Sequence, residues 1–174
     1  MKNNIKNLPN IIPIFPLEGA LLLPGGILPL NIFEPRYISL VDSIIGEHRL
    51  IGMIQPLEKN NDNLYPIGCA GRITSLTETE DNRYLIELTG LLRFKIVEEK
   101  KGIEGYRLIS PNWEIYKLDL NPPDESLIDR TELLAEIKKY FIRNKIDANM
   151  GDISSASLHQ LVATFSQICS FKPN

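Results

Sequence analysis

The chain is almost wholly apolar from Ile11 to Phe33, yet this run cannot form one continuous helix. Four prolines interrupt it, and each removes a backbone donor and clashes with the preceding helical turn. These prolines are Pro13, Pro16, Pro24 and Pro29. A lipid-exposed span needs an unbroken helix, and no small-residue cleavage site follows, so we interpret the run as neither a membrane span nor a signal peptide. It predicts two strands, Ile11–Phe15 and Leu28–Phe33, joined by a Pro-Gly-Gly turn.

A helical period begins directly after the second of these strands. Pro35 suits the first position of a helix, where its missing N–H costs nothing. Tyr37, Val41 and Ile44 then recur at helical spacing, and Gly46 suits the position just past the helix end. The pattern predicts a short amphipathic helix whose apolar face packs on a barrel.

Strand patterns separated by polar turns continue as far as residue 118. The expected strands are Arg49–Ile54, Tyr65–Leu76, Tyr84–Leu88, Leu91–Glu98 and Tyr106–Leu118. About six or seven short strands with one helix inserted after the second predict an α+β fold, built on a closed or nearly closed small barrel.

The period becomes helical after Asn121. One amphipathic helix is expected from Glu125 to about Lys145, with Asp124 as its cap, and another from about Ser155 to Ser170. We therefore divide the chain into a barrel domain, residues 1–121, and a C-terminal helical hairpin, residues 122–174. Two helices cannot bury both apolar stripes unless they dock on a further surface.

Composition and charge are those of an ordinary soluble protein. The net charge of −3 and the pI of about 5.5 argue against a binder of nucleic acid or of an anionic membrane. The two cysteines, Cys69 and Cys169, are far apart and form no CxxC motif. With no export signal, we expect reduced thiols in a cytoplasmic protein, with Cys69 packed in the core.

The residue patterns of common catalytic and metal sites are missing from the sequence. None of the 11 glycines is followed by lysine, as a phosphate-binding loop requires, and there is no GxSxG string. The two histidines, His48 and His159, lack the spacing of a zinc site. We expect no catalytic residues, no metal site and no cofactor.

Several motifs occur in an order and spacing that identify a family. They are PIFPL, a PGG turn, PLNIFEPRY, IGMIQP, IGCAGRI and LTGLLRFKI. Residues 11–117 thereby resemble the N-terminal domain of Lon proteases, a domain that also occurs as a small free-standing bacterial protein. The resemblance implies a PUA-like pseudo-barrel that helps to recognise unfolded or tagged substrates and to assemble the hexamer. The ATPase and serine-lysine protease modules of full-length Lon are absent from this sequence, so no enzyme activity is expected.

The leading hypothesis is a polypeptide-binding module, acting as an adaptor or chaperone-like factor on unfolded or flexible segments. The candidate peptide-binding residues are Leu22, Leu23, Ile27, Phe33, Glu34, Arg36 and Tyr37. Asn31, Glu34 and Arg36 have two interpretations: a cap and ion pair that hold the helix, or the polar rim of a peptide groove.

A second interaction surface is expected on the last helix. Its apolar stripe includes Leu161, Phe165, Ile168 and Phe171. Free-standing relatives usually continue with another helix, so the resemblance implies a shortened tail and an incompletely covered stripe. That stripe predicts self-association or capture of a client segment.

RNA binding is the alternative function, because PUA-like folds elsewhere bind RNA. A coherent basic stripe would favour it, formed by Arg72, Arg83, Arg93 and Lys95. Alternation along the strand places Arg93 and Lys95 on an exposed face over a buried Phe94, and the acidic pI counts against this alternative.

Overall fold

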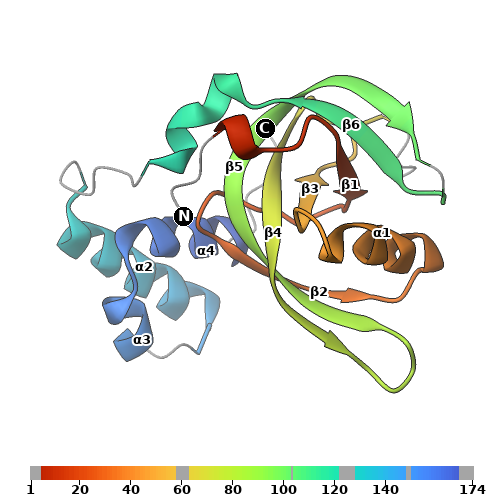
Figure 1. Cartoon of the computed structure of the whole chain (residues 1–174). Coiled ribbons are helices and arrows are strands. Elements are labelled where there is room, and N and C mark those ends of the chain that lie inside the picture. Colours follow the sequence, from red (N-terminus) through yellow and green to blue (C-terminus); the bar gives the residue numbers. More distant parts are fainter. Residues whose placement is uncertain (1–4, 58–62, 103, 122–127, 148–149, 169–174) are drawn as a thin grey trace.

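The computed structural model describes residues 5–57, 63–102, 104–121, 128–147 and 150–168 (Figure 1). The strands are β1 (Ile12–Pro16), β2 (Ile27–Ile32), β3 (Leu50–Ile54), β4 (Ile67–Glu78), β5 (Tyr84–Lys101) and β6 (Arg107–Asn112). The helical elements are η1 (Ile5–Asn7), α1 (Pro35–Ile45), η2 (Glu114–Leu120), α2 (Arg130–Asn144), α3 (Met150–Ser155) and α4 (Leu158–Ile168). In Figure 1, α2, α3 and α4 lie together on one side of the strands.

The strands form a six-stranded sheet in the order β2-β5-β4-β3-β1-β6. An additional pairing between β5 and β6 closes it into a barrel. The β1–β3 pair is parallel, and the other pairs are antiparallel. The predicted α+β pseudo-barrel with one inserted helix is thereby confirmed.

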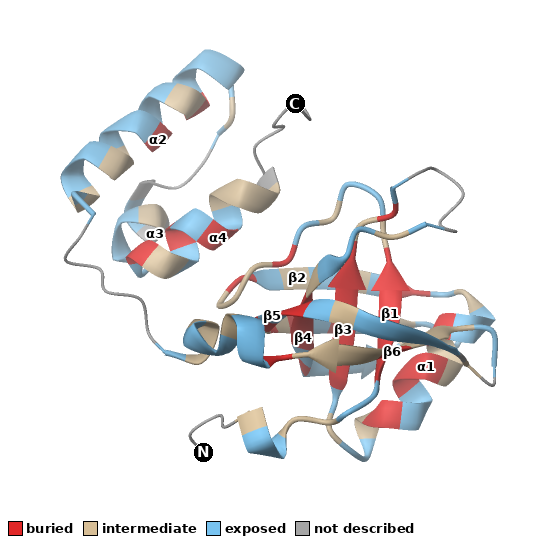
Figure 2. Cartoon of the chain, turned by 90° about the horizontal axis from the view of Figure 1, so that it is seen from above, coloured by how far each residue is buried: buried red, intermediate tan, exposed pale blue. Residues whose placement is uncertain are grey.

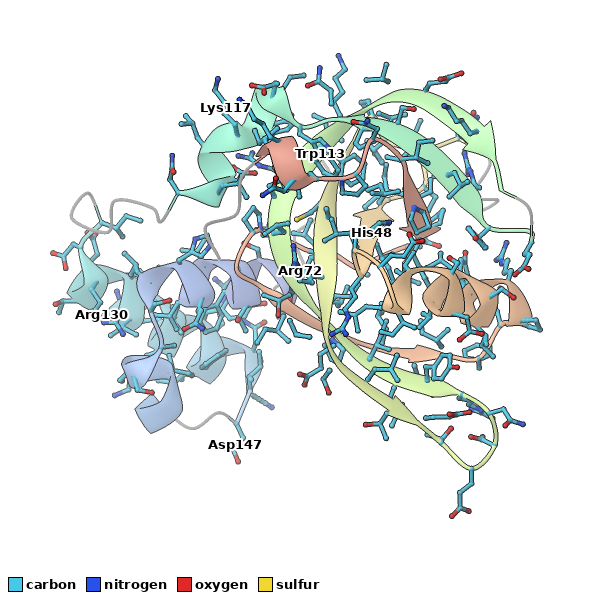
Figure 3. All side chains as sticks on the ribbon, viewed as in Figure 1. His48, Arg72, Trp113, Lys117, Arg130 and Asp147 are labelled. Atoms are coloured by element: carbon cyan, nitrogen blue, oxygen red, sulfur yellow. The ribbon has the colours of Figure 1, made fainter. Side chains whose placement is uncertain are left out.

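Several predicted strand boundaries are wrong. The first two strands do not pair with each other, because β1 lies between β3 and β6 whereas β2 pairs with β5. Tyr84–Leu88 and Leu91–Glu98 form one strand, since the backbone continues through Gly90. The strand expected to reach Leu118 ends at Asn112, where Trp113 turns inward and its indole N–H donates to the Pro9 carbonyl at 3.0 Å (Figure 3).

The first helix is confirmed on its predicted residues. Pro35 occupies its first turn, and Tyr37, Val41 and Ile44 are buried against the barrel. The ring of Tyr37 stacks on Phe15 with centroids 4.0 Å apart. Gly46 ends the helix with a right-handed φ of −82°, so this position does not use the left-handed conformation that glycine favours.

Two clusters of buried side chains fill the barrel, and Figure 2 shows them concentrated on the central strands and one face of α1. The larger cluster packs under α1 and contains Phe15, Leu22, Ile32, Tyr37, Leu40, Val41, Ile44, Ile51, Met53, Cys69, Ile73, Ile86 and Leu88. The second lies toward η1 and contains Ile12, Ile14, Leu50, Ile54, Ala70, Leu92, Phe94, Ile109 and Trp113. Cys69 and Phe94 are thus core residues, as predicted.

The C-terminal helices differ from a simple hairpin. Asp129 caps α2 by accepting from the backbone N–H groups of Thr131 and Glu132, whereas the predicted cap Asp124 lies outside the described residues. The short helix α3 separates α2 from α4. The Arg130 side chain links the start of α2 to α3 and to the turn before α4, because it donates to the carbonyls of Ser154 and Ala156 (Figure 3).

The apolar stripe of α4 is largely covered by the chain's own residues. Leu158, Leu161 and Ala163 are buried, and the half-buried Phe165 ring lies 5.3 Å from that of Phe141 on α2. The prediction that Leu161 is incompletely covered is therefore wrong, because this residue is only 3% exposed. Ile168 ends α4, its side chain is not described, and Phe171 lies outside the described residues.

Among the described residues, no helix combines the length and apolar character needed to cross a bilayer.

Candidate functional site

The loop between β1 and β2, residues 17–26, crosses the barrel beside β5 and is held by hydrogen bonds at both ends. At its start, Leu17 N–H donates to the Ile54 carbonyl at 3.0 Å. The Gln55 side chain accepts from Gly19 N–H at 3.2 Å and donates to the Ala20 carbonyl. At its end, Gly25 N–H donates to the Gly90 carbonyl, and Gly90 N–H donates to the Gly26 carbonyl, both at 2.8 Å. We call residues 17–26 the crossing loop.

Two glycines allow this loop to lie so close to its neighbours. A Cβ atom on Gly90 would lie 2.0 Å from the Leu23 carbonyl oxygen, so any side chain there would displace the loop. Gly25 has a φ of +75°, which glycine adopts without strain, and a Cβ on it would meet the His159 ring at 2.3 Å. The crossing loop is therefore in close contact with β5 on one side and α4 on the other.

The crossing loop lies where one edge of β5 has no strand beside it. Along this edge β2 pairs as far as Thr89, and β6 pairs from Lys95 onward. Between these two pairings, Gly90 bonds to the crossing loop and Arg93 bonds to η2. The Arg93 backbone N–H, which would otherwise be free for strand pairing, donates to the Asp119 carboxylate at 2.9 Å.

Two adjoining pockets flank the crossing loop. The larger has a volume of about 400 Å³ and is lined by Leu23, Pro24, Arg93, Leu118, Asp119, Asn121, His159, Val162 and Ala163. The smaller has a volume of about 140 Å³ and is lined by Ala20, Leu21, Leu22, Leu23, Met53, Ile54, Gln55, Ile67, Gly68, Cys69 and Arg93. Because Leu23 and Arg93 line both, we treat the two pockets as one groove and use that name below.

An ion pair forms the polar part of the groove. Arg93 Nε and Nη2 donate to the two carboxylate oxygens of Asp119 at 2.9 and 2.7 Å, and the guanidinium lies 4.6 Å from the centroid of the Tyr116 ring. The Asp119 side chain is only 9% exposed, whereas that of Arg93 is 44% exposed. Burial opposes ionisation of Asp119, but the hydrogen bonds from Arg93 outweigh it and hold the pKa of this carboxyl below its usual value.

The rest of the groove is mainly apolar and partly open to solvent. Leu118 is 74% exposed, Ile67 44% and Val162 42%. Such walls suit apolar side chains of a ligand, and the ion pair supplies hydrogen-bond donors between them. The Cys69 thiol lines the smaller pocket, but its burial raises its pKa, so it is a poor nucleophile.

The structure places the predicted peptide-binding residues in three different environments. Leu23 lines the groove. Tyr37 is 5% exposed and fills the core under α1, so assigning it to a binding surface is wrong. Leu22 lines the smaller pocket, but it is only 3% exposed and also belongs to this core. Ile27 and Phe33 are 50% and 60% exposed near opposite ends of β2, outside the groove.

Glu34 and Arg36 form an ion pair with each other at 2.8 Å, and Arg36 also lies over the Tyr37 ring at 4.5 Å. This geometry agrees with the ion pair of the first interpretation, but the Glu34 side chain makes no capping hydrogen bond to α1.

Most of the residues that line the groove were not predicted from the sequence. Val162 and Ala163 come from the helix that was expected to make contacts, and alternation placed Arg93 on an exposed face. Asp119, by contrast, was assigned to no site, since its partner lies 26 residues away in the sequence. Only the turn of η2 back toward β5 brings the two together.

The basic residues that would favour RNA do not form an unpaired stripe. Arg93 is held by Asp119, and Arg83 pairs with Asp81 at 2.7 Å while lying 5.9 Å from the Phe33 ring centroid. Arg72 lies on β4 (Figure 3), where its register partners are Leu50 and Thr89. Within the described ranges there is also no group of three His, Cys, Asp or Glu side chains placed to hold a metal ion.

The solved structures that resemble this fold include two Lon N-terminal domains. A Lon N-terminal domain protein from Xanthomonas campestris superposes with a TM-score of 0.57 at 24% identity, covering 76% of this chain and 73% of that one. The N-terminal domain of the Mycobacterium avium complex Lon protease gives a TM-score of 0.58 at 16% identity, covering 94% and 85%. These levels of identity support a shared fold.

The chain is also similar in sequence to Lon proteases. Lon protease 2 of Myxococcus xanthus is 29% identical over 100 residues, which is 55% of this chain and 12% of that protein. The Lon protease of Flavobacterium johnsoniae is 26% identical over 145 residues, or 80% of this chain and 17% of that protein. The chain thus spans less than a fifth of the length of these two relatives. The family model of the ATP-dependent protease La (LON) substrate-binding domain matches residues 11–174, and the chain therefore belongs to this family.

Proposed function

We propose that this chain is a non-enzymatic module that binds unfolded or flexible polypeptide segments in the groove beside the crossing loop. The observation that carries the proposal is the groove itself, where exposed apolar side chains from the barrel, η2 and α4 surround one ion pair. Membership of a substrate-binding domain family supports polypeptide as the ligand.

The apolar walls would supply most of the affinity. A ligand side chain placed between Leu23, Leu118 and Val162 would be removed from water, which contributes roughly 1.5–3 kcal/mol for each large apolar group. Ordering a flexible segment offsets part of this gain. Two or three such contacts contribute roughly 3–9 kcal/mol before that cost, so we expect an affinity no tighter than about micromolar, which suits a site that must release its ligands.

The cellular role follows from this binding without any chemistry of its own. We propose an adaptor or chaperone-like factor in the cytoplasm that holds exposed segments, either alone or for a protease. The purified chain is expected to hydrolyse neither ATP nor casein. Persistent turnover that scales with protein concentration after repurification would contradict this.

We propose that self-association through the C-terminal helices uses Ile142 on α2 and not the expected residues of α4. Leu161 is buried, but Ile142 on α2 is 71% exposed. A contact through α2 would leave the groove open.

The groove is tested by fluorescence anisotropy with labelled, reduced and alkylated α-lactalbumin as an unfolded probe. Val162→Asp places a charge in the apolar wall and is expected to weaken binding at least about tenfold, since a carboxylate beside an apolar ligand must be desolvated. Val97→Asp is the matched control, because Val97 is 67% exposed on β5 and lines neither pocket. It should bind like the wild type.

Equal binding by Val162→Asp and Val97→Asp would show that the groove is not the site. A labelled single-stranded RNA, tested in parallel, distinguishes RNA binding from polypeptide binding. Tighter binding of the RNA than of the unfolded probe would overturn the proposal.

A further inference from the structure

We propose that Asp119 sets the charge preference of the groove by masking Arg93, so that bound segments carry no charge beside their apolar side chains. The inference rests on the proposed function, because it concerns which polypeptides the same groove accepts.

The ion pair with Asp119 neutralises the charge of Arg93, but part of the guanidinium can still donate hydrogen bonds. Nε and Nη2 are bound to the two oxygens of Asp119, while the guanidinium side chain stays 44% exposed. A guanidinium has further N–H groups beyond the two used here, and these can donate to a ligand. Asp119 is nearly buried, so a ligand reaches the arginine but not the carboxylate.

Charge complementarity then favours an uncharged acceptor. Apart from His159, the charged side chains that line the groove are this cation and this anion, and their formal charges cancel. A ligand carboxylate would be attracted by Arg93 but repelled by Asp119 a few ångströms further away, and it would lose its hydration. A backbone carbonyl gains the same hydrogen bond at a smaller desolvation cost.

Asp119 also fixes the position of the arginine. One of its oxygens accepts from the Arg93 backbone N–H at 2.9 Å as well as from Nε, so main chain and side chain are held together. The Tyr116 ring supports the guanidinium at 4.6 Å. Replacing Asp119 by Asn keeps the size of the side chain and removes the mask.

The test compares two short fluorescent peptides that share a Leu-Phe-Leu centre and differ only in flanking Ser or flanking Asp residues. Wild-type protein should prefer the Ser peptide. Asp119→Asn should bind the Asp peptide about two- to fivefold more tightly than the wild type does, the range expected for one partly exposed ion pair. This gain should shrink as salt is raised.

A matched control exists outside the groove. Arg107 and Glu99 form a second bidentate pair, with both distances 2.6 Å, and neither residue lines the groove. Glu99→Gln removes the carboxylate charge from an equivalent ion pair outside the groove, so it should leave the preference between the two peptides unchanged.

Arg93→Gln provides the opposite change and serves if Asp119→Asn does not fold. It unmasks the anion, so a third peptide with flanking Lys residues should then gain affinity. The double variant Arg93→Gln/Asp119→Asn should return to the wild-type preference for uncharged flanks.

The outcomes separate the two proposals. If wild-type protein binds none of the peptides, polypeptide binding in the groove fails. If it binds them but neither Asp119→Asn nor Arg93→Gln shifts the charge preference, the masking role of Asp119 is overturned while polypeptide binding stands.

Discussion

Arg93 and Asp119 meet across 26 residues of sequence through a bidentate ion pair, with N–O distances of 2.9 and 2.7 Å. The pair joins η2 to the stretch of β5 that has neither β2 nor β6 beside it. With the hydrogen bond from the Arg93 backbone N–H to the same carboxylate, it forms one side of the groove, which Leu118 and Leu23 also line. The ion pair thereby links the barrel to the segment that leads into the C-terminal helices.

Gly90→Ala should destabilise the protein and weaken polypeptide binding, because the new methyl group would overlap the Leu23 carbonyl and displace the crossing loop. We expect a loss of about 1–3 kcal/mol in the free energy of unfolding, measured with urea. Gly46→Ala is the control. Its Cβ has no atom within 4 Å and its φ is −82°, so it should be neutral or stabilising. Equal stability of both variants would show that the loop does not depend on Gly90.

Val41→Asp should unfold the barrel or cost at least about 3 kcal/mol, because an unpaired carboxylate would replace a side chain that is 1% exposed. Thermal melting followed by circular dichroism measures this. Ser43→Asp adds the same charge at an exposed position of the same helix and should change the midpoint little. A Val41→Asp protein that melts like the wild type would mean that α1 is peripheral.

The strands and α1 were predictable because their signals are local. Pro35, the spacing of Tyr37, Val41 and Ile44, and the alternation around Phe94 each follow from a few neighbouring residues. The pairing of β1 with β3 and β6 was not, since no local pattern states which strands meet. For the same reason, Leu23 and the last helix could be predicted as contact segments. The pairing of Arg93 with Asp119 could not be predicted, because it depends on the tertiary fold.

His48 should make stability pH-dependent. Burial lowers the pKa of its imidazole below the usual value, and this effect, helped by nearby Arg72, outweighs the opposing effect of Glu47. The neutral ring accepts a hydrogen bond from Leu50 N–H at 3.0 Å through Nδ1. The unfolded chain therefore takes up the proton first, and stability falls as the pH drops below about 6.5, at a rate of up to about 1.4 kcal/mol per pH unit.

Urea denaturation between about pH 7.5 and 5.5 measures this slope. In His48→Asn the side-chain oxygen can still accept from Leu50 N–H, but the titration is removed, so the slope should flatten. Identical slopes for wild type and His48→Asn would show that this histidine does not couple folding to pH.

Phe165→Ser should destabilise the C-terminal helices and should not relieve association, because the ring packs 5.3 Å from Phe141. A loss of about 2–3 kcal/mol is expected. Ile142→Ser, at a side chain that is 71% exposed, should leave stability unchanged and reduce concentration-dependent association in sedimentation velocity runs. Association unaffected by Ile142→Ser would exclude α2 as the contact.

The location of the groove is tested most directly by ¹H–¹⁵N NMR titration of the wild-type protein with the Leu-Phe-Leu peptide that has uncharged flanks. We expect the largest chemical-shift changes at Leu23, Arg93 and Val162, which the fold brings together from three separate elements. Val162→Asp should remove these changes. Shifts centred on Phe33 at the end of β2, or no shifts at saturating peptide, would contradict this expectation.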